Sequence, residues 1–204
     1  MFDSQLRDWI DPPLNKLGSM LVEARIKPND ITIAGFVIGI IAVPLIALHY
    51  YKLAFVFVLV NRLMDGLDGA VARQSSATHA GGYLDIVLDF IFYSAVVFGF
   101  ALAEYDNAVY SAFLIFSFIG TGTTFLAFAI FAQKLGLQSN HQGEKSFYYL
   151  TGLVEGFETI VALALMCLLP DYFSVIALLF GILCWISTLA RIFMAVELLD
   201  KHSK

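Results

Sequence analysis

Charged residues and cysteines are scarce in this sequence, and their scarcity excludes several classes of protein. Of its 204 residues, 14% are charged and 59% are hydrophobic, whereas ordinary globular chains contain about 25% charged and about 45–50% apolar residues. The two cysteines, Cys167 and Cys184, both lie inside apolar runs and indicate neither a disulfide framework nor a metal motif. The composition therefore excludes a secreted, disordered or nucleic-acid-binding chain and predicts a polytopic membrane protein.

Six apolar runs follow the first 30 residues. They span 31–50, 53–73, 83–104, 109–132, 151–169 and 173–196. Each is close to the roughly 20 residues that a helix needs to cross a hydrocarbon core of about 30 Å. We therefore predict an all-α fold with six transmembrane helices, the first of them kinked at Pro44. No linker or repeat interrupts residues 31–204, which we assign to one transmembrane domain.

Residues 1–30 are mixed rather than apolar and form a separate segment. Leu14, Leu17 and Leu21 recur at helical spacing, and polar residues occupy the other faces of the same helix. This pattern predicts an amphipathic helix that lies in the membrane interface. Pro12 and Pro13 are expected to set its start, because proline is tolerated only in the first turn of a helix.

The distribution of lysine and arginine predicts the orientation in the membrane. One side of the predicted helices has a single basic residue, Lys52. The other side collects Arg7, Lys16, Arg25, Lys27, Arg73, Lys134, Lys145, Lys201 and Lys204. We therefore expect both termini and the two longer loops to be cytoplasmic. The start of the chain lacks the pattern of a cleaved signal peptide.

Four aspartates interrupt the second and third runs, although a charged group at mid-bilayer costs at least about 2.5–3.5 kcal/mol. Asp65 and Asp68 are spaced i, i+3, and Asp85 and Asp89 are spaced i, i+4, so each pair shares one helix face. The loop 74–82 makes the two helices antiparallel neighbours, so that both pairs can converge in one cavity. Carboxylate clusters suit hard divalent cations, and two such ions would nearly cancel the four charges. The pattern predicts a two-metal site of the kind used in phosphoryl displacement.

Small residues surround the aspartates, namely Gly66, Gly69, Ala70 and Ala72 before the loop and Gly81 and Gly82 after it. Glycine lets a ligand approach the backbone closely. Arg73 follows at the membrane edge, where a guanidinium can hold phosphate oxygens. These residues predict a bulky phosphorylated ligand beside the metal site.

The same residues form a longer pattern. Asp65, Asp68, Gly69, Ala72, Arg73, Gly81, Asp85 and Asp89 stand at the spacings DxxDGxxAR, seven residues, GxxxDxxxD. This pattern resembles the signature of the CDP-alcohol phosphatidyltransferases, and Pro28-Asn29, Thr32 and Gly35 also look like that family. The resemblance implies an enzyme of phospholipid synthesis that displaces CMP from a CDP-linked donor by attack of an alcohol hydroxyl.

The resemblance also implies roles for individual residues. Asp65, Asp68 and Asp85 would be ligands of Mg²⁺ or Mn²⁺, and Asp89 would be a ligand or lie close to the metals. Asp89 would also be the general base that takes the proton of the acceptor. The donor pocket would include Gly69, Ala72, Arg73 and Gly81 beside the aspartates.

Residues outside the signature leave the acceptor open. One interpretation is an acceptor pocket lined by Glu155, Glu158, Arg191, Lys134 and Lys145. The alternative is a structural ion pair between the last two helices, formed by the glutamates and Arg191. The two glutamates favour a neutral or amine-bearing acceptor over a phosphorylated one. Arg62 lies one turn before Asp65 and is either its local salt partner or a substrate ligand.

The expected function is that of an enzyme in the lipid bilayer which transfers a phosphatidyl group from CDP-diacylglycerol to a small alcohol. An alternative is a soluble CDP-alcohol as donor with diacylglycerol as acceptor. An ion-coupled transporter could use the same intramembrane carboxylates, and a non-catalytic scaffold would have no reason to keep four of them. A compact chain of this kind is typical of a bacterial cytoplasmic (inner) membrane, and a homodimer is implied by analogy with the family alone.

Overall fold

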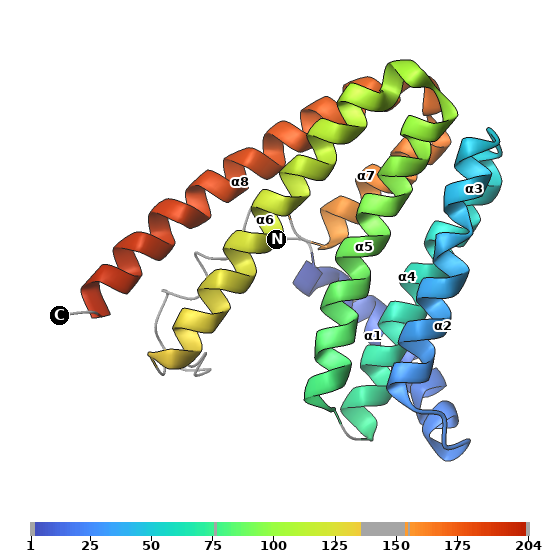
Figure 1. The fold of residues 1–204 in the computed structure, drawn as a ribbon. Helices are drawn as coiled ribbons and strands as arrows, with labels where there is room; N and C mark the ends of the chain where they lie inside the picture. The colour runs from blue at the N-terminus through green and yellow to red at the C-terminus, as the bar shows by residue number, and fades with distance from the viewer. Residues whose placement is uncertain (1–2, 76, 136–153, 155, 203–204) are drawn as a thin grey trace.

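The computed structural model describes residues 3–75, 77–135, 154 and 156–202 of the chain (Figure 1). Within these residues the regular structure is entirely helical. The helices are α1 (Asp3–Glu23), α2 (Pro28–Ile40), α3 (Ala42–Ala47), α4 (Tyr51–Gln74), α5 (His79–Ala103), η1 (Tyr105–Asn107), α6 (Ala108–Lys134), α7 (Gly156–Leu168), η3 (Pro170–Tyr172) and α8 (Phe173–His202). The all-α prediction is therefore confirmed for the described part of the chain.

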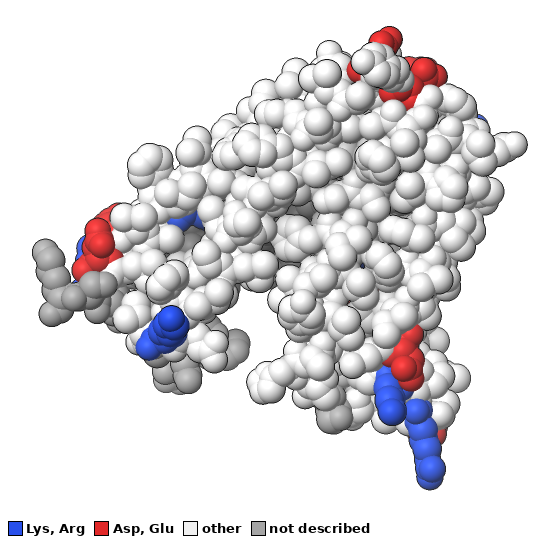
Figure 2. Space-filling view, viewed as in Figure 1, with Lys and Arg blue, Asp and Glu red and all other residues white. Residues whose placement is uncertain are grey.

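Four described segments are long and apolar enough to cross a membrane: Pro28–Ala47, His79–Ala103, Tyr105–Lys134 and Pro170–Lys201. Helix α4 is not among them, and it carries the charges of Arg62 and the first aspartate pair. Helix α7 is a shorter apolar helix, and the start of its predicted run lies outside the described residues. Figure 2 shows charged side chains gathered near the ends of the helices, with a broad uncharged surface between them. The protein thus has the build of a multi-pass membrane protein, while the count of six spans stays a prediction.

Helix α1 begins earlier than the sequence suggested. Its span includes Pro12 and Pro13, so the expectation that these prolines set its start is wrong. Proline interrupts the hydrogen bonds of a helix interior, but the following turns of α1 gain contacts with α4. Leu14 is buried, and its Cδ1 lies 2.8 Å from the position that a Cβ on Gly66 would take. Gln74 donates a hydrogen bond to the carbonyl of Asn15 at 2.9 Å.

The first membrane segment is interrupted where Pro44 predicted a kink. Helix α2 ends at Ile40, helix α3 begins at Ala42, and Pro44 lies in α3. Proline has no N–H to donate to the carbonyl four residues before it, and its ring crowds that carbonyl. The carbonyl concerned belongs to Ile40, which is the last residue of α2. The break therefore has a local cause in the sequence.

Helices α3 to α8 contribute buried side chains to a common apolar core. Its largest fully buried side chains include Ile46, Phe92, Phe100, Phe173, Leu163 and Met166. Phe100 of α5 stacks on Phe173 of α8 with ring centroids 4.4 Å apart. Helices α6 and α8 run side by side (Figure 1), and a Cβ on Gly181 would lie 2.5 Å from Phe113 Cε1. Small residues allow this close packing, which is the main source of helix association in lipid.

A tight connection joins α4 to α5. Helix α4 ends at Gln74 and α5 begins at His79, so the connection is shorter than the predicted loop 74–82. Thr78 caps α5 by accepting a hydrogen bond from the Gly81 N–H at 3.0 Å. An N-cap threonine satisfies one of the free N–H groups at the start of a helix. This hairpin fixes the antiparallel register that brings the two aspartate pairs together.

Candidate metal and nucleotide site

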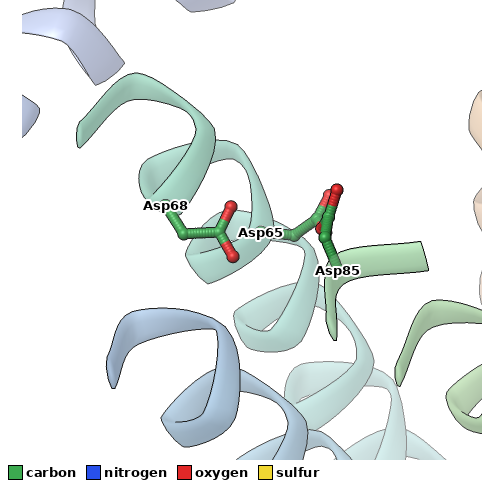
Figure 3. Close-up of side chains that lie close together, drawn as sticks. All are labelled: Asp65, Asp68 and Asp85. Atoms are coloured by element: carbon green, nitrogen blue, oxygen red, sulfur yellow. The ribbon is translucent and has the colours of Figure 1, made fainter. Parts of the chain in front are cut away.

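Three of the four aspartates gather at one point between α4 and α5. Asp65, Asp68 and Asp85 each present a carboxylate oxygen, and these oxygens lie within 4.8 Å of one another. Figure 3 shows Asp65 and Asp68 extending from α4 toward the same space as Asp85 of α5. The i, i+3 spacing puts the first two on one face of α4, as the sequence predicts. We call these three residues the aspartate triad.

The triad is only partly open to its surroundings. Asp68 is 5% exposed, and Thr32 of α2 donates a hydrogen bond to its Oδ2. Three carboxylates this close repel one another unless a cation lies between them. Their donor atoms are all hard oxygens, which are the ligands preferred by Mg²⁺ and Mn²⁺. The donor set therefore fits the divalent cation that the resemblance implies.

Asp89 lies beside the triad and has partners of its own. Both of its carboxylate oxygens accept hydrogen bonds from the guanidinium of Arg62. Arg62 Nη2 donates to Oδ1, and Arg62 Nη1 donates to Oδ2 at 3.2 Å. Tyr93 donates a further hydrogen bond to Oδ2 at 3.0 Å. Arg62 Nη1 also lies 3.5 Å from Asp65 Oδ2. The structure thus favours the salt-partner interpretation of Arg62, with Asp89 as its main partner.

Two adjoining hollows meet at the triad. The smaller holds about 230 Å³ of empty space and is lined by Thr32, Gly35, Phe36, Asn61, Arg62, Leu88 and all four aspartates. The larger holds about 510 Å³ and is lined by Pro28, Asn29, Thr32, Asp68, Gly69, Ala72, Ala77, Thr78, Gly81, Gly82 and Asp85. Asp68 and Asp85 of the triad, with Thr32, line both hollows, and Asp65 lines the smaller one alone.

The predicted donor-binding residues divide between this pocket and its edge. Gly69, Ala72 and Gly81 line the larger hollow. A Cβ on Gly81 would lie 2.7 Å from Asn29 Oδ1, so a side chain there would meet the opposite wall. Arg73 is not a lining residue, and its half-exposed guanidinium lies 3.8 Å from Asp11 of α1.

The predicted acceptor-binding residues are not gathered at the triad. Glu155 and Lys145 lie outside the described residues. Lys134 is exposed at the end of α6, with its Nζ 5.6 Å from the ring centroid of Phe131. Glu158 lies in the first turn of α7, and buried Arg191 donates to the carbonyls of Thr121 and Val154 at 3.3 and 3.4 Å. Of the three described residues none lines either hollow.

The sequence analysis missed two polar residues that shape the site, Asn61 and Tyr93, and gave Thr32 no contact there. Asn61 accepts hydrogen bonds from Arg62, Tyr93 donates to Asp89, and Thr32 donates to Asp68. Asn61 stands next to Arg62 inside an apolar run, one turn before Asp65, and this second polar residue is a signal that could have marked it. Tyr93 follows Asp89 by one helical turn and could have been found by the same spacing.

Comparisons with known proteins give a consistent result. The sequence model of the CDP-alcohol phosphatidyltransferase family matches residues 25–199. The inner membrane protein YnjF of Escherichia coli is 48% identical over 193 residues, which cover 94% of each chain. The archaetidylinositol phosphate synthase of Pyrococcus horikoshii is 35% identical over 100 residues, or 48% of this chain and 53% of that one. The crystal structure of the Mycobacterium tuberculosis phosphatidylinositol phosphate synthase with CDP-DAG bound shares the fold, with a TM-score of 0.64 at 20% identity over 89% of this chain and 92% of that one.

Proposed function

Because the chain belongs to the CDP-alcohol phosphatidyltransferase family, we propose that it transfers a phosphatidyl group from CDP-diacylglycerol to the hydroxyl of a small alcohol, releasing CMP. The family consists of membrane phosphotransferases of phospholipid biosynthesis. One observation supports this proposal above the others: two members of the aspartate triad, Asp68 and Asp85, line the pocket that Gly69, Ala72 and Gly81 also line. A metal site and a pocket for a phosphorylated ligand therefore share one boundary.

The triad would hold Mg²⁺ or Mn²⁺ through Asp65, Asp68 and Asp85. Such an ion, when bound, stabilises negative charge on the transferring phosphoryl group and on the departing CMP. Thr32 fixes the orientation of the Asp68 carboxylate through its hydrogen bond to Oδ2. The sequence predicts two ions from four carboxylates, whereas the described oxygens within 4.8 Å of one another come from three.

Asp89 would accept the proton of the acceptor hydroxyl. A carboxylate offers about four lone-pair positions, and Arg62 and Tyr93 take three of them, two on Oδ2 and one on Oδ1. One position on Oδ1 is left for a hydroxyl. The same contacts hold the carboxylate in one orientation, and a positioned base contributes about 10²–10⁴-fold to a rate.

The larger hollow would hold the CDP portion of the donor. Gly69, Ala72 and Gly81 line it with no side chain or with a methyl group alone, so a ligand can approach the helix backbone closely there. Arg73 would hold phosphate oxygens of the donor at the edge of the pocket. It is free to leave Asp11 for this, because an exposed ion pair with 3.8 Å between its atoms is weak. A soluble CDP-alcohol with diacylglycerol as acceptor is the alternative within the reaction class.

The remaining features of the proposal concern the acceptor and the membrane. The relatives' printed names include makers of inositol phosphate lipids, so inositol phosphate belongs among the acceptors to be tested beside neutral and amine-bearing alcohols. We propose six spans, with both termini and the site on the cytoplasmic side of an inner membrane. Residues 1–30 would form an interfacial segment and 31–204 the catalytic domain, and a homodimer follows the family analogy. Membership of the family favours this transferase over an ion-coupled transporter.

Release of CMP by the purified protein tests the proposal directly. The assay contains lipid–detergent micelles, Mg²⁺ or Mn²⁺, CDP-diacylglycerol and one acceptor from glycerol phosphate, inositol phosphate, serine, inositol, choline and ethanolamine. CDP-choline and CDP-ethanolamine with diacylglycerol are assayed in parallel. We expect release with one acceptor, its loss in Asp89→Asn, and its retention in Asp106→Asn, a matched change in exposed η1. Equal release by wild type and Asp89→Asn would contradict the role of Asp89.

A further inference from the structure

Helix α1 crosses α4 at the end that carries the family signature (Figure 1). A Cβ at Gly18 would lie 3.2 Å from the Cβ of Ala70, so the two helices meet there with little space for a side chain. Leu14 is buried over Gly66, and Gln74 donates a hydrogen bond to a backbone carbonyl of α1 at 2.9 Å. Helix α1 therefore covers α4 along the same turns that carry the signature.

The crossing also places α1 beside the signature arginine. Arg73 Nη2 lies 3.8 Å from Asp11 Oδ1, and a Cβ at Gly69 would lie 3.4 Å from Arg73 Nη1. Gly69 and Ala72 line the larger hollow, so Arg73 stands between α1 and that pocket. The sequence model of the family begins its match at residue 25, after the end of α1. A segment outside the matched residues thus contacts the part of α4 that forms the pocket.

Helix α1 has two further flanks, and they differ in polarity. One flank consists of exposed apolar side chains at the spacing of one helix face, namely Pro13, Leu17 and Met20. The other consists of polar side chains at four-residue spacing, namely Asn15, Ser19 and Glu23. At 3.6 residues per turn, these flanks lie on opposite sides of the face that packs on α4. A helix with one apolar and one polar flank fits the boundary between hydrocarbon and water.

An exposed apolar strip of α4 ends where α1 crosses it. Val56, Leu59 and Leu63 are exposed and recur at helical spacing, as expected for a face in contact with lipid. The next positions of the strip are Gly66 and Ala70, which lie under α1. The last residues of α4 follow within about one turn and are polar and exposed. Helix α1 therefore lies at the end of a lipid-facing strip, which identifies lipid as the occupant of its apolar flank.

We propose that the apolar flank of α1 lies in the cytoplasmic leaflet of the membrane, and that this lipid contact keeps α1 against α4 and holds the donor pocket in shape. The inference rests on the proposed function in one respect, namely that the larger hollow receives the CDP portion of the donor. Leu17 and Met20 are then lipid contacts. Leu14 is a positioning residue, because it acts on the donor only through α4.

The lipid contact acts on the pocket through the effective concentration of α1 at α4. The polar contacts of Gln74 and Arg73 with α1 are exposed and contribute little by themselves. A helix confined to the membrane surface meets the end of α4 more often than one that is free in water. Loss of the lipid contact therefore lowers the fraction of molecules in which α1 covers the signature turns.

Spin labels on α1 test the lipid contact without reference to activity. Labels are attached at Leu17→Cys, Met20→Cys or Glu23→Cys in the full-length protein, in nanodiscs of phosphatidylethanolamine and phosphatidylglycerol. Cys167 and Cys184 are buried, and unsubstituted protein is the labelling blank. Oxygen concentrates in hydrocarbon and a nickel complex in water, so we expect the first two labels to collide mainly with oxygen and the third with nickel.

Two results would overturn the lipid contact. The first is collision of all three labels mainly with nickel, which would place the apolar flank in water. The second is immobile labels at residues 17 and 20 that neither reagent reaches, which would indicate a protein partner on this flank.

Binding of CDP in the presence of Mn²⁺ tests the effect on the donor pocket. Leu17→Gln with Met20→Gln makes the apolar flank polar and should raise the dissociation constant for CDP about tenfold in the same nanodiscs. Leu14→Ala removes the contact with α4 itself and should have an effect at least as large. Lys16→Gln with Glu23→Gln is the matched control, because it places two glutamines on exposed polar positions of the same helix and removes one charge of each sign.

The kinetics of CMP release separate positioning from general destabilisation. Leu17→Gln with Met20→Gln should raise KM for CDP-diacylglycerol and leave kcat at saturating donor close to that of the wild type, because the aspartates are untouched. The substituted side chains are exposed, so the variant is expected to fold. CDP affinity and KM equal to those of the control variant would overturn the role of α1 at the pocket.

Failure of this inference and failure of the proposed function are distinguishable. Wild-type protein that releases CMP, with unchanged CDP affinity in the flank variant and in Leu14→Ala, would remove the role of α1 and leave the proposed function standing. Wild-type protein that neither binds CDP nor releases CMP would remove the proposed function and with it the effect on the donor pocket. The spin labels decide the lipid contact in either case.

Discussion

The crossing of α2 and α4 is so close that one methyl group should disturb it. Gly39 of α2 faces Asn61 of α4, and a Cβ at Gly39 would lie 2.7 Å from Asn61 Cβ, 2.8 Å from Nδ2 and 2.9 Å from Cγ. Optimal carbon–carbon separations are about 3.5–4.0 Å, so Gly39→Ala requires the helices to move apart by roughly 1 Å. Rotation of Asn61 cannot relieve the contact, because its Cβ is fixed to the backbone. The substitution therefore strains the packing of two helices that form the site.

Three contributions determine how much Gly39→Ala changes the free energy of unfolding. Overpacking of a buried contact costs about 1–3 kcal/mol, and weakening the Asn61 hydrogen bond to Gly35 costs about a further 1–3 kcal/mol. The better helix propensity of alanine offsets about 0.5–1 kcal/mol. We expect Gly39→Ala to lower the free energy of unfolding by about 2–4 kcal/mol, or the thermal midpoint by about 5–15 °C for a chain of this size.

Thermal unfolding of the purified protein in detergent measures this loss. Gly82→Ala is the matched control, because a Cβ at Gly82 meets nothing within 4 Å, and its thermal midpoint should equal or exceed that of the wild type. Since Asn61 also holds Arg62, CMP release by Gly39→Ala should fall at temperatures where the variant stays folded. A thermal midpoint of Gly39→Ala equal to that of Gly82→Ala would refute the close crossing of α2 and α4.

Three further results are expected at the site itself. Asp68→Asn should abolish Mn²⁺ binding and CMP release together, because the triad loses one of its three carboxylates; normal metal affinity in this variant would contradict the ligand assignment. Gly81→Ala should raise KM for CDP-diacylglycerol about tenfold with a smaller change in kcat, since its Cβ would lie 2.7 Å from Asn29 Oδ1 across the pocket. Removal of divalent cations with a chelator should stop CMP release, and Mg²⁺ or Mn²⁺ should restore it; release that persists in the chelator would argue against a metal-dependent reaction.

The helices and the triad could be predicted from the sequence because they depend on local spacing. Apolar runs of membrane-spanning length placed α4 and α6, and the run 83–104 placed α5 to within a few residues. The start of α5 at His79 follows from the cap at Thr78, which hydropathy alone does not reveal. Asp65 and Asp68 share a helix face for the same geometric reason, so their meeting with Asp85 required only an antiparallel hairpin.

The partners of Asp89 could not be predicted in the same way. Its spacing of four residues from Asp85 places both on one face of α5, but spacing does not show which side chain of α4 reaches it. Arg62 reaches Asp89 because Asn61 and the rings of Phe92 and Tyr93 hold the guanidinium in that direction. Contacts of this kind depend on the rotamer and on the register of two helices. Helix α1 illustrates the same limit, because its path through Pro12 and Pro13 depends on packing against α4.

The tight hairpin of α4 and α5 has a consequence for how the protein enters the membrane. Helix α4 alone would expose Arg62, Asp65 and Asp68 to lipid, and each charge at mid-helix opposes insertion by about 2.5–3.5 kcal/mol. Helix α5 is strongly apolar and carries the carboxylate that pairs with Arg62. We therefore expect α4 to leave the translocation machinery together with α5, as a preformed pair, rather than as a helix that partitions into lipid by itself. Assembly of the metal site would then begin during membrane insertion, before the last helices are made.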